Sequence, residues 1–461
     1  MRATLSMEKK MGKGLGERSV LQQTLSKKQK TDMKKSLVWF RNDLRIQDNT
    51  ILSHACEDAD LVIAVYCFDP RQFAEGDFGF VKTGKFRAKF LLESVQNLQN
   101  QLASLNISLL ICFGKPEEAI PPIVKENDID HLYFQEEWTR DERNVQENLL
   151  SELADNLSVK RYYDQFLFHP EDIPFDSPED IPMVFTSFRK KLEKYARVRE
   201  PLPAPTPLST SNLLQKVSDT PSLEGLGHST FEIDERTAFP FKGGEKEAWG
   251  RLEHYIWRSE QLKEYKQTRN GLVGTDYSSK FSAWLANGCI SARSIYSEVR
   301  KFEKEIHKNS STYWMIFELI WRDYFKYISL KFGDSIFHLG GILSKEYEWK
   351  SDPKVLSKWI EGRTKYEFVN SNMKELAATG WMSNRGRQNV ASFWAKEMEQ
   401  DWRIGASYFE SLLIDYDVHS NWGNWMYNAG VGNDPRDRKF NIERQAEMYD
   451  GDHSFRKLWN Q

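Results

Sequence analysis

The segment LVIAVYCF, residues 61–68, is one of five short runs of β-branched and aromatic residues in the first third of this 461-residue chain. Runs of this length and composition are typical of buried β-strands. The other four are SLVWF at 36–40, ISLLICFG at 107–114, HLYFQE at 131–136 and RYYDQFLF at 161–168. Stretches such as KFRAKFLLESVQNLQNQLASL lie between them and predict amphipathic helices, because their apolar residues are spaced three and four apart.

This alternation of strand and helix predicts a parallel α/β sheet with crossover helices over residues 35–168. An open parallel sheet binds its ligand at the carboxyl ends of its strands, so we expect a ligand site there. The glycine-rich phosphate loop of nicotinamide enzymes does not occur in this region, which disfavours a dehydrogenase.

The rest of the chain changes character twice. Residues 169–243 are rich in Pro, Ser and Asp, as in EPLPAPTPLSTS, and predict a long interdomain connector with one helix near 187–198. From 244 to 461 the pattern is helical, as in KEAWGRLEHYIWRSEQLKEYK. The predicted fold class is therefore α/β plus all-α, with the sheet domain first.

Composition restricts the class of protein. Hydrophobic residues make up 40% and charged residues 28% of the chain, and no apolar run is long enough to span a membrane. The net charge of −3 gives no sign of nucleic-acid binding, so such binding would need a local basic cluster. Thirteen of the 15 tryptophans fall between residue 249 and the C-terminus. Tryptophan is therefore strongly concentrated in the helical part of the chain.

The first 34 residues are lysine-rich and aperiodic and predict a flexible basic tail, with Met33 as an alternative start. Acidic residues such as Glu8 and Glu17 argue against an organellar transit peptide. Four scattered cysteines suit a reducing compartment, so we expect a cytoplasmic protein. Their simplest interpretation is as small buried hydrophobes.

Three polar motifs in the helical part carry chemistry. In ELIWRDYFKY, residues 318–327, an acid, an indole and a guanidinium share one helix face, although a surface ion pair would explain them equally well. In TDYSSKFSAWLANGCIS, residues 275–291, hydroxyls and a lysine precede a helix start and suit a diphosphate, although helix capping would explain a single serine. In DYDVHSNWGNWMY, residues 415–427, two carboxylates and two indoles lie close together.

These motifs, in this order, resemble the photolyase and cryptochrome family from about residue 35 to about residue 449. The resemblance also rests on WFRNDLRIQDN at 39–49, TGWMSNRGRQNVASF at 379–393 and QDWR at 400–403. SNRGRQNVASF and NWMYNAGVGNDPRDRKFN are most similar to the cryptochrome DASH branch. The resemblance implies an antenna-binding α/β domain, a helical FAD-binding catalytic domain and a monomer.

The resemblance implies where FAD binds. Its phosphates would be held by Tyr265, Ser278, Ser279, Lys280, Phe281 and Ser282. Its sugar and ring would be lined by Asn384, Arg387, Asp415, Asp417 and Asn421. A buried carboxylate such as Asp415 needs a partner, and Arg387 is a plausible one. Asn421 matches the position that faces the flavin N5, where a neutral amide suits a fully reduced, electron-donating flavin.

Trp425, Trp402 and Trp349 match the family's electron-relay tryptophans between flavin and surface. Each alone would be interpreted as core packing, and only the matched triple favours a relay. The α/β domain would bind an antenna chromophore, 5,10-methenyltetrahydrofolate, through Glu137. The adjacent Glu136 is the alternative acid for this position, and a solvated run of charged residues is the competing interpretation.

The resemblance also implies a cavity for a flipped pyrimidine dimer. It would be lined by Glu318, Trp321, Arg322, Asn384, Gln388 and Tyr427, with Arg269, Arg385, Arg436 and Arg438 as phosphate contacts at its mouth. Tyr427 and Gln388 replace a Trp and a Met of ordinary cyclobutane-dimer photolyases, which favours single-stranded over duplex DNA. Ser383 and Asn384 stand where enzymes for (6-4) photoproducts carry a His pair, so that chemistry is not expected.

We therefore expect a light-dependent lyase that repairs cyclobutane pyrimidine dimers in single-stranded DNA. Two alternatives stay open at this level. One is a blue-light photoreceptor that signals through a partner, although the chain ends soon after its last motif and shows no long signalling tail. The other is light-independent binding of RNA or single-stranded DNA through the arginines alone.

Overall fold

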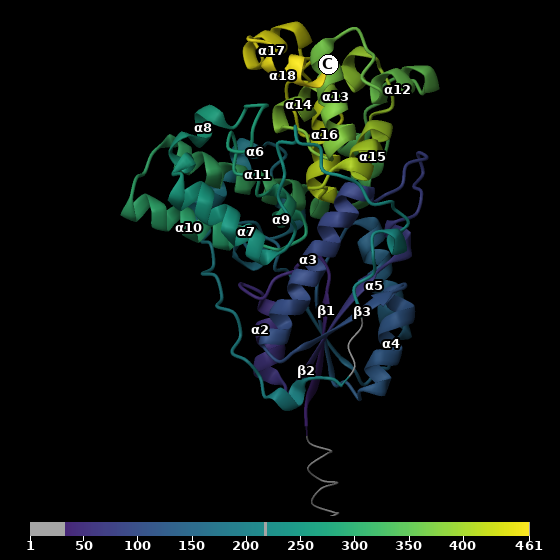
Figure 1. Cartoon of the computed structure of the whole chain (residues 1–461), viewed down its shortest axis with the longest axis vertical. Helices are drawn as coiled ribbons and strands as arrows, with labels where there is room; N and C mark the ends of the chain where they lie inside the picture. Colours follow the sequence, from purple (N-terminus) through teal and green to yellow (C-terminus); the bar gives the residue numbers. More distant parts are fainter. Residues whose placement is uncertain (1–32, 216–218, 461) are drawn as a thin grey trace, which may run out of the picture.

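The computed structural model describes residues 33–215 and 219–460. Most of the predicted basic tail lies outside these residues. A five-stranded, all-parallel sheet forms the first domain and helices form the second, as the sequence predicted (Figure 1). The strands are β1 (Lys35–Phe40), β2 (Leu61–Phe68), β3 (Ser108–Phe113), β4 (His131–Gln135) and β5 (Ser158–Tyr162).

The strand order is β3-β2-β1-β4-β5. The chain adds β2 and β3 on one side of β1 and then crosses back to add β4 and β5 on the other side, which makes the boundary between β1 and β4 a switch point. Such a switch point leaves a crevice at the carboxyl ends of the two strands. Helices α2 (Thr50–Asp58) and α3 (Lys85–Ser104) cover one face, and α4 (Pro116–Glu126) and α5 (Arg140–Glu152) cover the other. Both faces are buried, which explains the continuous apolar runs in the strand sequences.

The last strand, β5, begins three residues before the predicted run 161–168 and ends at Tyr162, so residues 163–168 lie outside the sheet. A buried carboxylate of the helical domain, Asp323, accepts hydrogen bonds from the backbone N–H groups of Leu167 (3.0 Å) and Phe168 (2.8 Å). These contacts take the place of a strand partner. Burial raises the pKa of the Asp323 carboxyl to about 6, although the two backbone hydrogen bonds oppose that rise.

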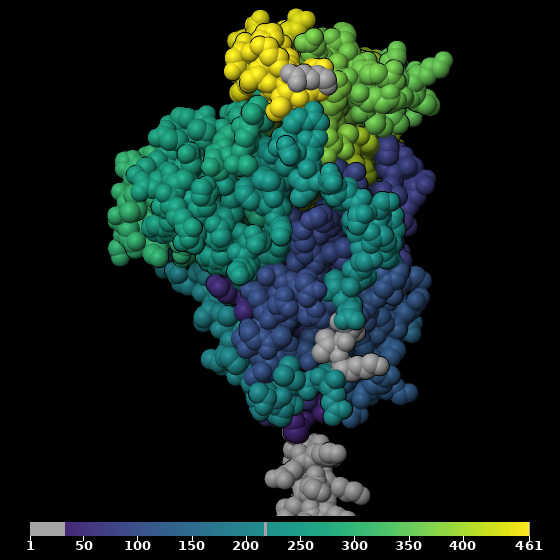
Figure 2. All heavy atoms as spheres, in the orientation of Figure 1, coloured from purple at the N-terminus to yellow at the C-terminus, as the bar shows by residue number. Residues whose placement is uncertain are grey.

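Residues 169–243 run from the helical domain down one side of the α/β domain and back (Figure 1). They contain one α-helix, α6 (Phe185–Tyr195), which begins two residues before the predicted position and ends three residues before it. In Figure 2 this connector lies across the surface of the α/β domain. Asn212 fixes it there, because its side chain bonds both the N–H (2.8 Å) and the carbonyl (2.9 Å) of Val62.

The second domain is helical throughout, apart from short turns and irregular loops. Its helices are α7 (Glu245–Leu252), α8 (Tyr265–Thr268), α9 (Ser282–Ala286), α10 (Ala292–Glu305), α11 (Ser310–Phe332), α12 (Pro353–Ile360), α13 (Glu367–Thr379), α14 (Asn384–Ser392), α15 (Trp402–Leu412), α16 (Val418–Ala429), α17 (Ile442–Tyr449) and α18 (Ser454–Trp459). Within residues 33–215 and 219–460, no helix is both long and apolar enough to cross a membrane.

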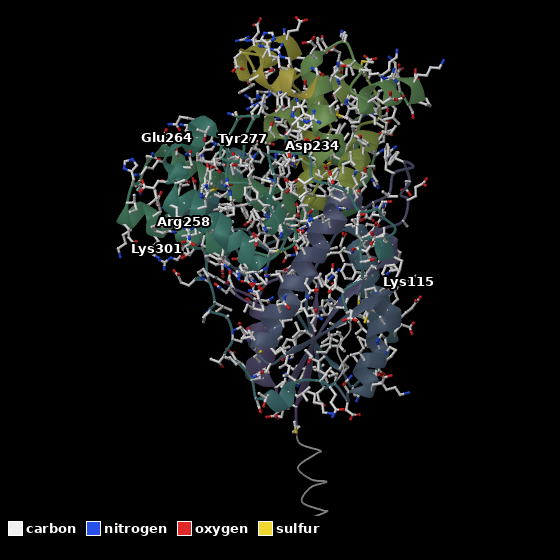
Figure 3. The ribbon with its side chains drawn as sticks, viewed as in Figure 1. Lys115, Asp234, Arg258, Glu264, Tyr277 and Lys301 are labelled. Carbon is white, nitrogen blue, oxygen red and sulfur yellow. The ribbon has the colours of Figure 1, made fainter. Side chains whose placement is uncertain are left out.

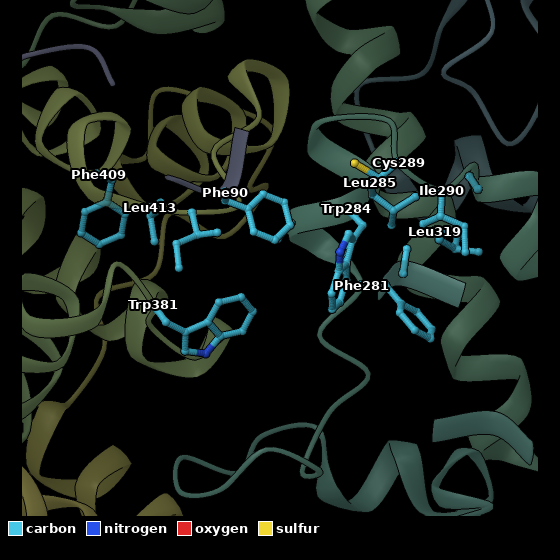
Figure 4. Packing of buried hydrophobic residues seen from close by; sticks show 14 of the residues in the cluster. Phe90, Phe281, Trp284, Leu285, Cys289, Ile290, Leu319, Trp381, Phe409 and Leu413 are labelled. Atoms are coloured by element: carbon cyan, nitrogen blue, oxygen red, sulfur yellow. The ribbon is translucent and has the colours of Figure 1, made fainter. Parts of the chain in front are cut away.

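One hydrophobic core continues from the α2/α3 face of the sheet into the helical domain. Figure 4 shows this packing, in which Phe90 of α3 lies near Trp284 and Trp381 of the second domain. The ring centroids of Phe90 and Trp284 are 6.0 Å apart. At Gly288 (φ +68°) the backbones approach so closely that a Cβ would lie 2.0 Å from the Asn42 carbonyl oxygen.

A buried ion network joins the domains at the same junction. Arg293 of α10 contacts Asp48 (2.7 Å) and Asp164 (2.6 Å) of the α/β domain, and Arg45 also contacts Asp164 (3.1 Å). All four side chains are almost completely buried. Buried charges of this kind are tolerated only when paired, so the network stabilises one relative placement of the domains.

Candidate flavin site

A small cavity of about 70 Å³ lies between α14, α15 and α16. Seven of the residues singled out in the sequence line it: Asn384, Arg387, Gln388, Asp415, Asp417, Asn421 and Trp425. They come from the start of α14, from the turn before α16 and from α16 itself. Positions more than 40 residues apart in sequence therefore converge on one polar recess inside an apolar domain.

The pairing that the sequence predicted for Asp415 is present. Nη2 of Arg387 donates to both carboxylate oxygens of Asp415, at 2.9 and 3.0 Å, and Nε donates to the Met382 carbonyl at 2.9 Å. Asp415 is buried, so this guanidinium supplies the charge partner that the carboxylate needs. The remaining donors of Arg387 stay available to a ligand in the cavity.

Asp417 caps α16 and separates two cavities. Its Oδ1 accepts the N–H of Ser420 at 2.8 Å, and its Oδ2 accepts from Nζ of Lys326 at 3.2 Å. Burial alone would raise the pKa of Asp417, but Lys326, His419 and Arg322 outweigh burial and hold that pKa far below its usual range. Asp417 is therefore a carboxylate over the whole neutral pH range.

Asn421 has a fixed orientation. Its amide nitrogen donates to the carbonyl of Ala406 on α15 at 3.0 Å. Within the described residues its amide oxygen has no hydrogen-bond partner, and the side chain lines the small cavity. Asn421 therefore presents an acceptor, which matches a ligand that offers an N–H donor.

The serine loop before α9 lies beside this cavity. The backbone carbonyls of Ser278 and Ser279 accept hydrogen bonds from Arg251, both at 3.0 Å. Ser282 is exposed at the start of α9. The hydroxyls of all three serines are free to donate to a ligand, because no group in the described residues bonds them. Arg251 was not singled out in the sequence, where it reads as an ordinary charged helix residue.

Lys280 does not extend into solvent. Its Nζ lies 3.2 Å from the ring centroid of Tyr277 and 4.8 Å from that of Trp381, and it has no hydrogen-bond partner in the described residues. Burial lowers the pKa of Lys280, although Glu375 opposes that shift. Tyr277, labelled in Figure 3, accepts a hydrogen bond from Nε1 of Trp381 at 3.2 Å, which connects the serine loop to the small cavity.

Two further predicted phosphate contacts are deeply packed. Tyr265 and Phe281 are both buried. Desolvation raises the pKa of the Tyr265 phenol far above its usual value, and the nearby Glu318 adds to the rise. Phe281 can therefore offer only its backbone to a ligand.

The three predicted relay tryptophans lie on or beside α15. The ring of Trp425 lies against Gly405, one helical turn after Trp402 on α15, so that a Cβ at Gly405 would be 2.2 Å from Cη2 of Trp425. A backbone bridge between Lys350 and Gln400 places Trp349 beside the start of α15. Trp425 and Trp402 are buried and Trp349 is partly exposed.

A second group of predicted residues, the aromatic cluster, consists of Glu318 and Trp321 of α11 and Tyr427 of α16. The rings of Trp321 and Tyr427 meet edge to face with centroids 6.2 Å apart, and Arg269 forms an ion pair with Glu318 at 2.8 Å. Burial raises the pKa of Glu318, although Arg269 and other donors oppose that rise.

Gln388 lines the small cavity and accepts a hydrogen bond from Arg385 at 2.9 Å. Arg436 and Arg438 are exposed, and Arg438 donates to the hydroxyl of Tyr427 in the aromatic cluster at 3.2 Å.

Arg322 is not part of the aromatic cluster, which corrects the sequence prediction. Its guanidinium donates to the carbonyls of Gln165 (2.6 Å) and Leu285 (3.2 Å) and lines a different cavity. Trp321 and Arg322 are neighbours in sequence, but successive residues of a helix point about 100° apart. Arg322 therefore faces the α/β domain, whereas Trp321 faces Phe185 and Tyr427.

A large cavity of about 1030 Å³ lies between the two domains, at the carboxyl ends of β1 and β4. Glu137 lines it and is buried, and its Oε1 accepts from Asn42 at 3.0 Å and from Gln135 at 3.3 Å. Glu136 does not line the cavity and instead pairs with Arg161 (3.3 Å). Of the two candidate acids, the fold brings Glu137 to the predicted ligand site.

Comparison with known proteins identifies the two domains. The DNA photolyase family model matches residues 36–207, and the model of the FAD binding domain of DNA photolyase matches residues 314–460. The chain belongs to the photolyase and cryptochrome family. It is an FAD protein of this type.

Photolyase and cryptochrome relatives resemble the chain over nearly its whole length. Cryptochrome DASH of Gloeobacter violaceus is 50% identical over 425 residues, which cover 92% of this chain and 85% of the relative. Cryptochrome DASH of Xenopus laevis is 47% identical and covers 91% and 81%. The structure of the Synechocystis cryptochrome superposes with a TM-score of 0.89 at 46% identity, covering 93% and 89%. These proteins support the DASH branch that the motifs indicated.

The residues around the small cavity fit the flavin of FAD. The free amide oxygen of Asn421 suits a protonated ring nitrogen, and Arg387 and Asp415 supply a donor and an acceptor for the polar edge of the ring. The unbonded serine hydroxyls and the unpartnered Lys280 ammonium suit the diphosphate. The cavity is smaller than the roughly 300–1,000 Å³ of a whole ligand pocket. The rest of the cofactor would therefore extend along the serine loop.

Proposed function

We propose that this protein repairs cyclobutane pyrimidine dimers with light, preferably in single-stranded DNA. The observation that carries the proposal is the aromatic cluster, in which the rings of Trp321 and Tyr427 meet edge to face and Glu318, on the same helix as Trp321, pairs with Arg269. An aromatic-walled recess selects a base that is already weakly stacked, because little energy is needed to extrude it. FAD, when bound in its reduced form, supplies the one electron that splits the cyclobutane ring and then returns.

The residues of this chain position the substrate and tune its polarity. Trp321 is held in place by Phe185, because the two rings stack with centroids 3.6 Å apart. Glu318 can donate a hydrogen bond to a base carbonyl when protonated, and its raised pKa favours that form. Arg385 lies where it can contact a phosphate at the mouth. With an edge-on tyrosine beside Trp321, the aromatic cluster offers fewer stacking partners than two indoles would, which favours single strands.

The fixed orientation of the Asn421 amide supports repair over a signalling function alone. An amide whose nitrogen is committed to Ala406 cannot deliver a proton to the flavin, and its oxygen stabilises a protonated ring nitrogen instead. That arrangement favours the reduced, electron-donating cofactor.

The test uses FAD-loaded protein, reduced chemically in the dark and then exposed to blue light with dimer-containing oligonucleotides, single-stranded and duplex. We expect loss of the dimer, faster in the single strand. Glu318→Ala should reduce repair and retain FAD, and Glu305→Ala at the exposed end of α10 is the matched control. If neither oligonucleotide is repaired, a signalling photoreceptor becomes the better account.

A second measurement separates repair from electron supply. Trp402→Phe should block light-driven reduction of the flavin and leave repair by chemically reduced protein intact. Normal photoreduction of this variant would show that the relay is assigned to the wrong residues.

We further propose 5,10-methenyltetrahydrofolate as the antenna in the 1030 Å³ cavity, with Glu137 as an acceptor for its pterin. The photolyase of Sulfolobus tokodaii has been solved with two FAD molecules, with the implication of a novel light-harvesting cofactor, so FAD is the alternative occupant. Reconstitution of Glu137→Gln and unchanged protein with each chromophore, followed by absorbance, distinguishes the two. Equal folate binding by both proteins would remove Glu137 from the proposal.

A further inference from the structure

An exposed tyrosine, Tyr347, lies against Trp349, the last of the three predicted relay tryptophans. The rings of Tyr347 and Trp349 meet edge to face with centroids 5.5 Å apart, and 38% of Tyr347 is exposed. The Tyr347 hydroxyl donates to Oδ2 of Asp437 at 2.8 Å. The row Trp425, Trp402, Trp349 therefore continues to a redox-active phenol with a base on its proton.

None of the three indoles has such a base. The N–H groups of Trp425 and Trp349 are buried and have no acceptor in the described part of the chain. The N–H of Trp402 donates to the Leu339 carbonyl at 2.9 Å, and a neutral amide oxygen does not take up the proton. A tryptophan of this row that loses an electron therefore stays a radical cation. Because it keeps its proton and its charge, it remains a strong oxidant.

We propose that Tyr347 is the terminal electron donor of this row and that Asp437 accepts its proton. This inference rests on the relay in the proposed function, in which photoexcited oxidised flavin is the oxidant that generates the Trp349 radical cation. One electron moves from Tyr347 to Trp349 and restores the neutral indole. The phenolic proton moves to the carboxylate of Asp437, which leaves a neutral tyrosyl radical and a carboxylic acid.

Two lysines near the Tyr347 ring favour loss of the electron and the proton from Tyr347 in a single step. Nζ of Lys396 lies 4.8 Å from the centre of the Tyr347 ring, and Nζ of Lys345 lies 5.6 Å from it. A positive charge on the ring would be repelled by both cations, so a tyrosyl radical cation is disfavoured. Lys396 also bonds Oδ1 of Asp437 at 2.5 Å, which orients the other carboxylate oxygen toward the phenol.

Asp437 is ionised and able to accept. Burial works to raise its pKa, but hydrogen bonds from Lys396 and Tyr347 outweigh it and lower the pKa below the usual value. Since both Tyr347 and Asp437 are more than one-third exposed, dissolved thiols can reach the radical and reduce it. The outcome is a separated charge that does not return directly to the flavin.

The experiment compares FAD-loaded unchanged protein with Tyr347→Phe, Asp437→Asn and, as the matched control, Tyr195→Phe, which alters another exposed tyrosine. Electron paramagnetic resonance after a blue flash, with ring-deuterated tyrosine incorporated, identifies the radical. We expect a tyrosyl signal in the unchanged protein and in Tyr195→Phe. In Tyr347→Phe a tryptophan signal should replace it, and light-driven flavin reduction should slow several-fold because the charge recombines.

Asp437→Asn should slow formation of the tyrosyl signal and change its dependence on deuterated solvent, because the proton acceptor is lost. A tyrosyl signal that persists in Tyr347→Phe, or the absence of one from unchanged protein that photoreduces normally, would overturn the inference. Failure of the relay itself gives a different result: neither the unchanged protein nor any variant then forms a tryptophan or tyrosyl radical.

Discussion

Replacing Glu375 with Gln should weaken the dependence of stability on pH. Glu375 lies on α13 and is 1% exposed, and burial raises the pKa of its carboxyl from 4.5 to about 8, although Lys280 and Arg387 oppose the rise. The folded protein thus keeps a proton that the unfolded chain releases above pH 4.5. The folded state therefore loses stability as the pH rises from 4.5 to about 8.

The structure sets the size of this effect. Each pH unit in the window costs about 1.4 kcal/mol. A window of roughly 3.5 units then gives a cost of roughly 5 kcal/mol at pH 8, which is an upper value because the surroundings can rearrange. Gln has nearly the same shape and no charge, so the variant should unfold with similar free energy near pH 5 and should be more stable than the unchanged protein by several kcal/mol near pH 8.

Urea unfolding of FAD-loaded protein at both pH values measures this difference. Glu367→Gln is the matched control, because it removes an exposed carboxylate from the first turn of the same helix. It should shift stability equally at both pH values. If Glu375→Gln also gave the same difference at pH 5 and pH 8, Glu375 would not be a proton-retaining buried acid and the reasoning would fail.

Two further predictions concern the packing around the small cavity. Gly405→Ala should lower the unfolding free energy by roughly 1–3 kcal/mol, because its Cβ would lie 2.2 Å from Trp425. Gly250→Ala on α7 has no atom within 4 Å of the added Cβ. It should leave the unfolding free energy unchanged or raise it by up to roughly 1 kcal/mol. Circular dichroism during heating compares them, and equal destabilisation would contradict the steric argument. Arg387→Met should destabilise by roughly 3–5 kcal/mol and reduce the flavin retained on gel filtration, since Asp415 would lose its guanidinium; full retention would contradict its role at the site.

The sequence was informative wherever local pattern and structure coincide. The strand runs gave four of the five strands nearly to their ends, because apolar continuity reflects burial on both faces of a parallel sheet. The fifth prediction, 161–168, overlaps β5 only at residues 161 and 162, and beyond them Asp323 of the other domain accepts hydrogen bonds from the backbone N–H groups of Leu167 and Phe168. A carboxylate 155 residues away leaves no trace in the local pattern.

The candidate site shows the same division. Sequence alone determined which residue types are present and their order: the serine loop, the tryptophans, Arg387 with Asp415, and the two adjacent acids before α5. Only the tertiary structure decided that Arg322 turns to the interdomain cavity, that Glu137 and not Glu136 lines it, and that Lys280 is buried. Helix and strand periods fix which residues share a face, but the neighbour that covers a face is chosen by packing between segments far apart in the chain. Asp437 meets Tyr347 across 90 residues for that reason.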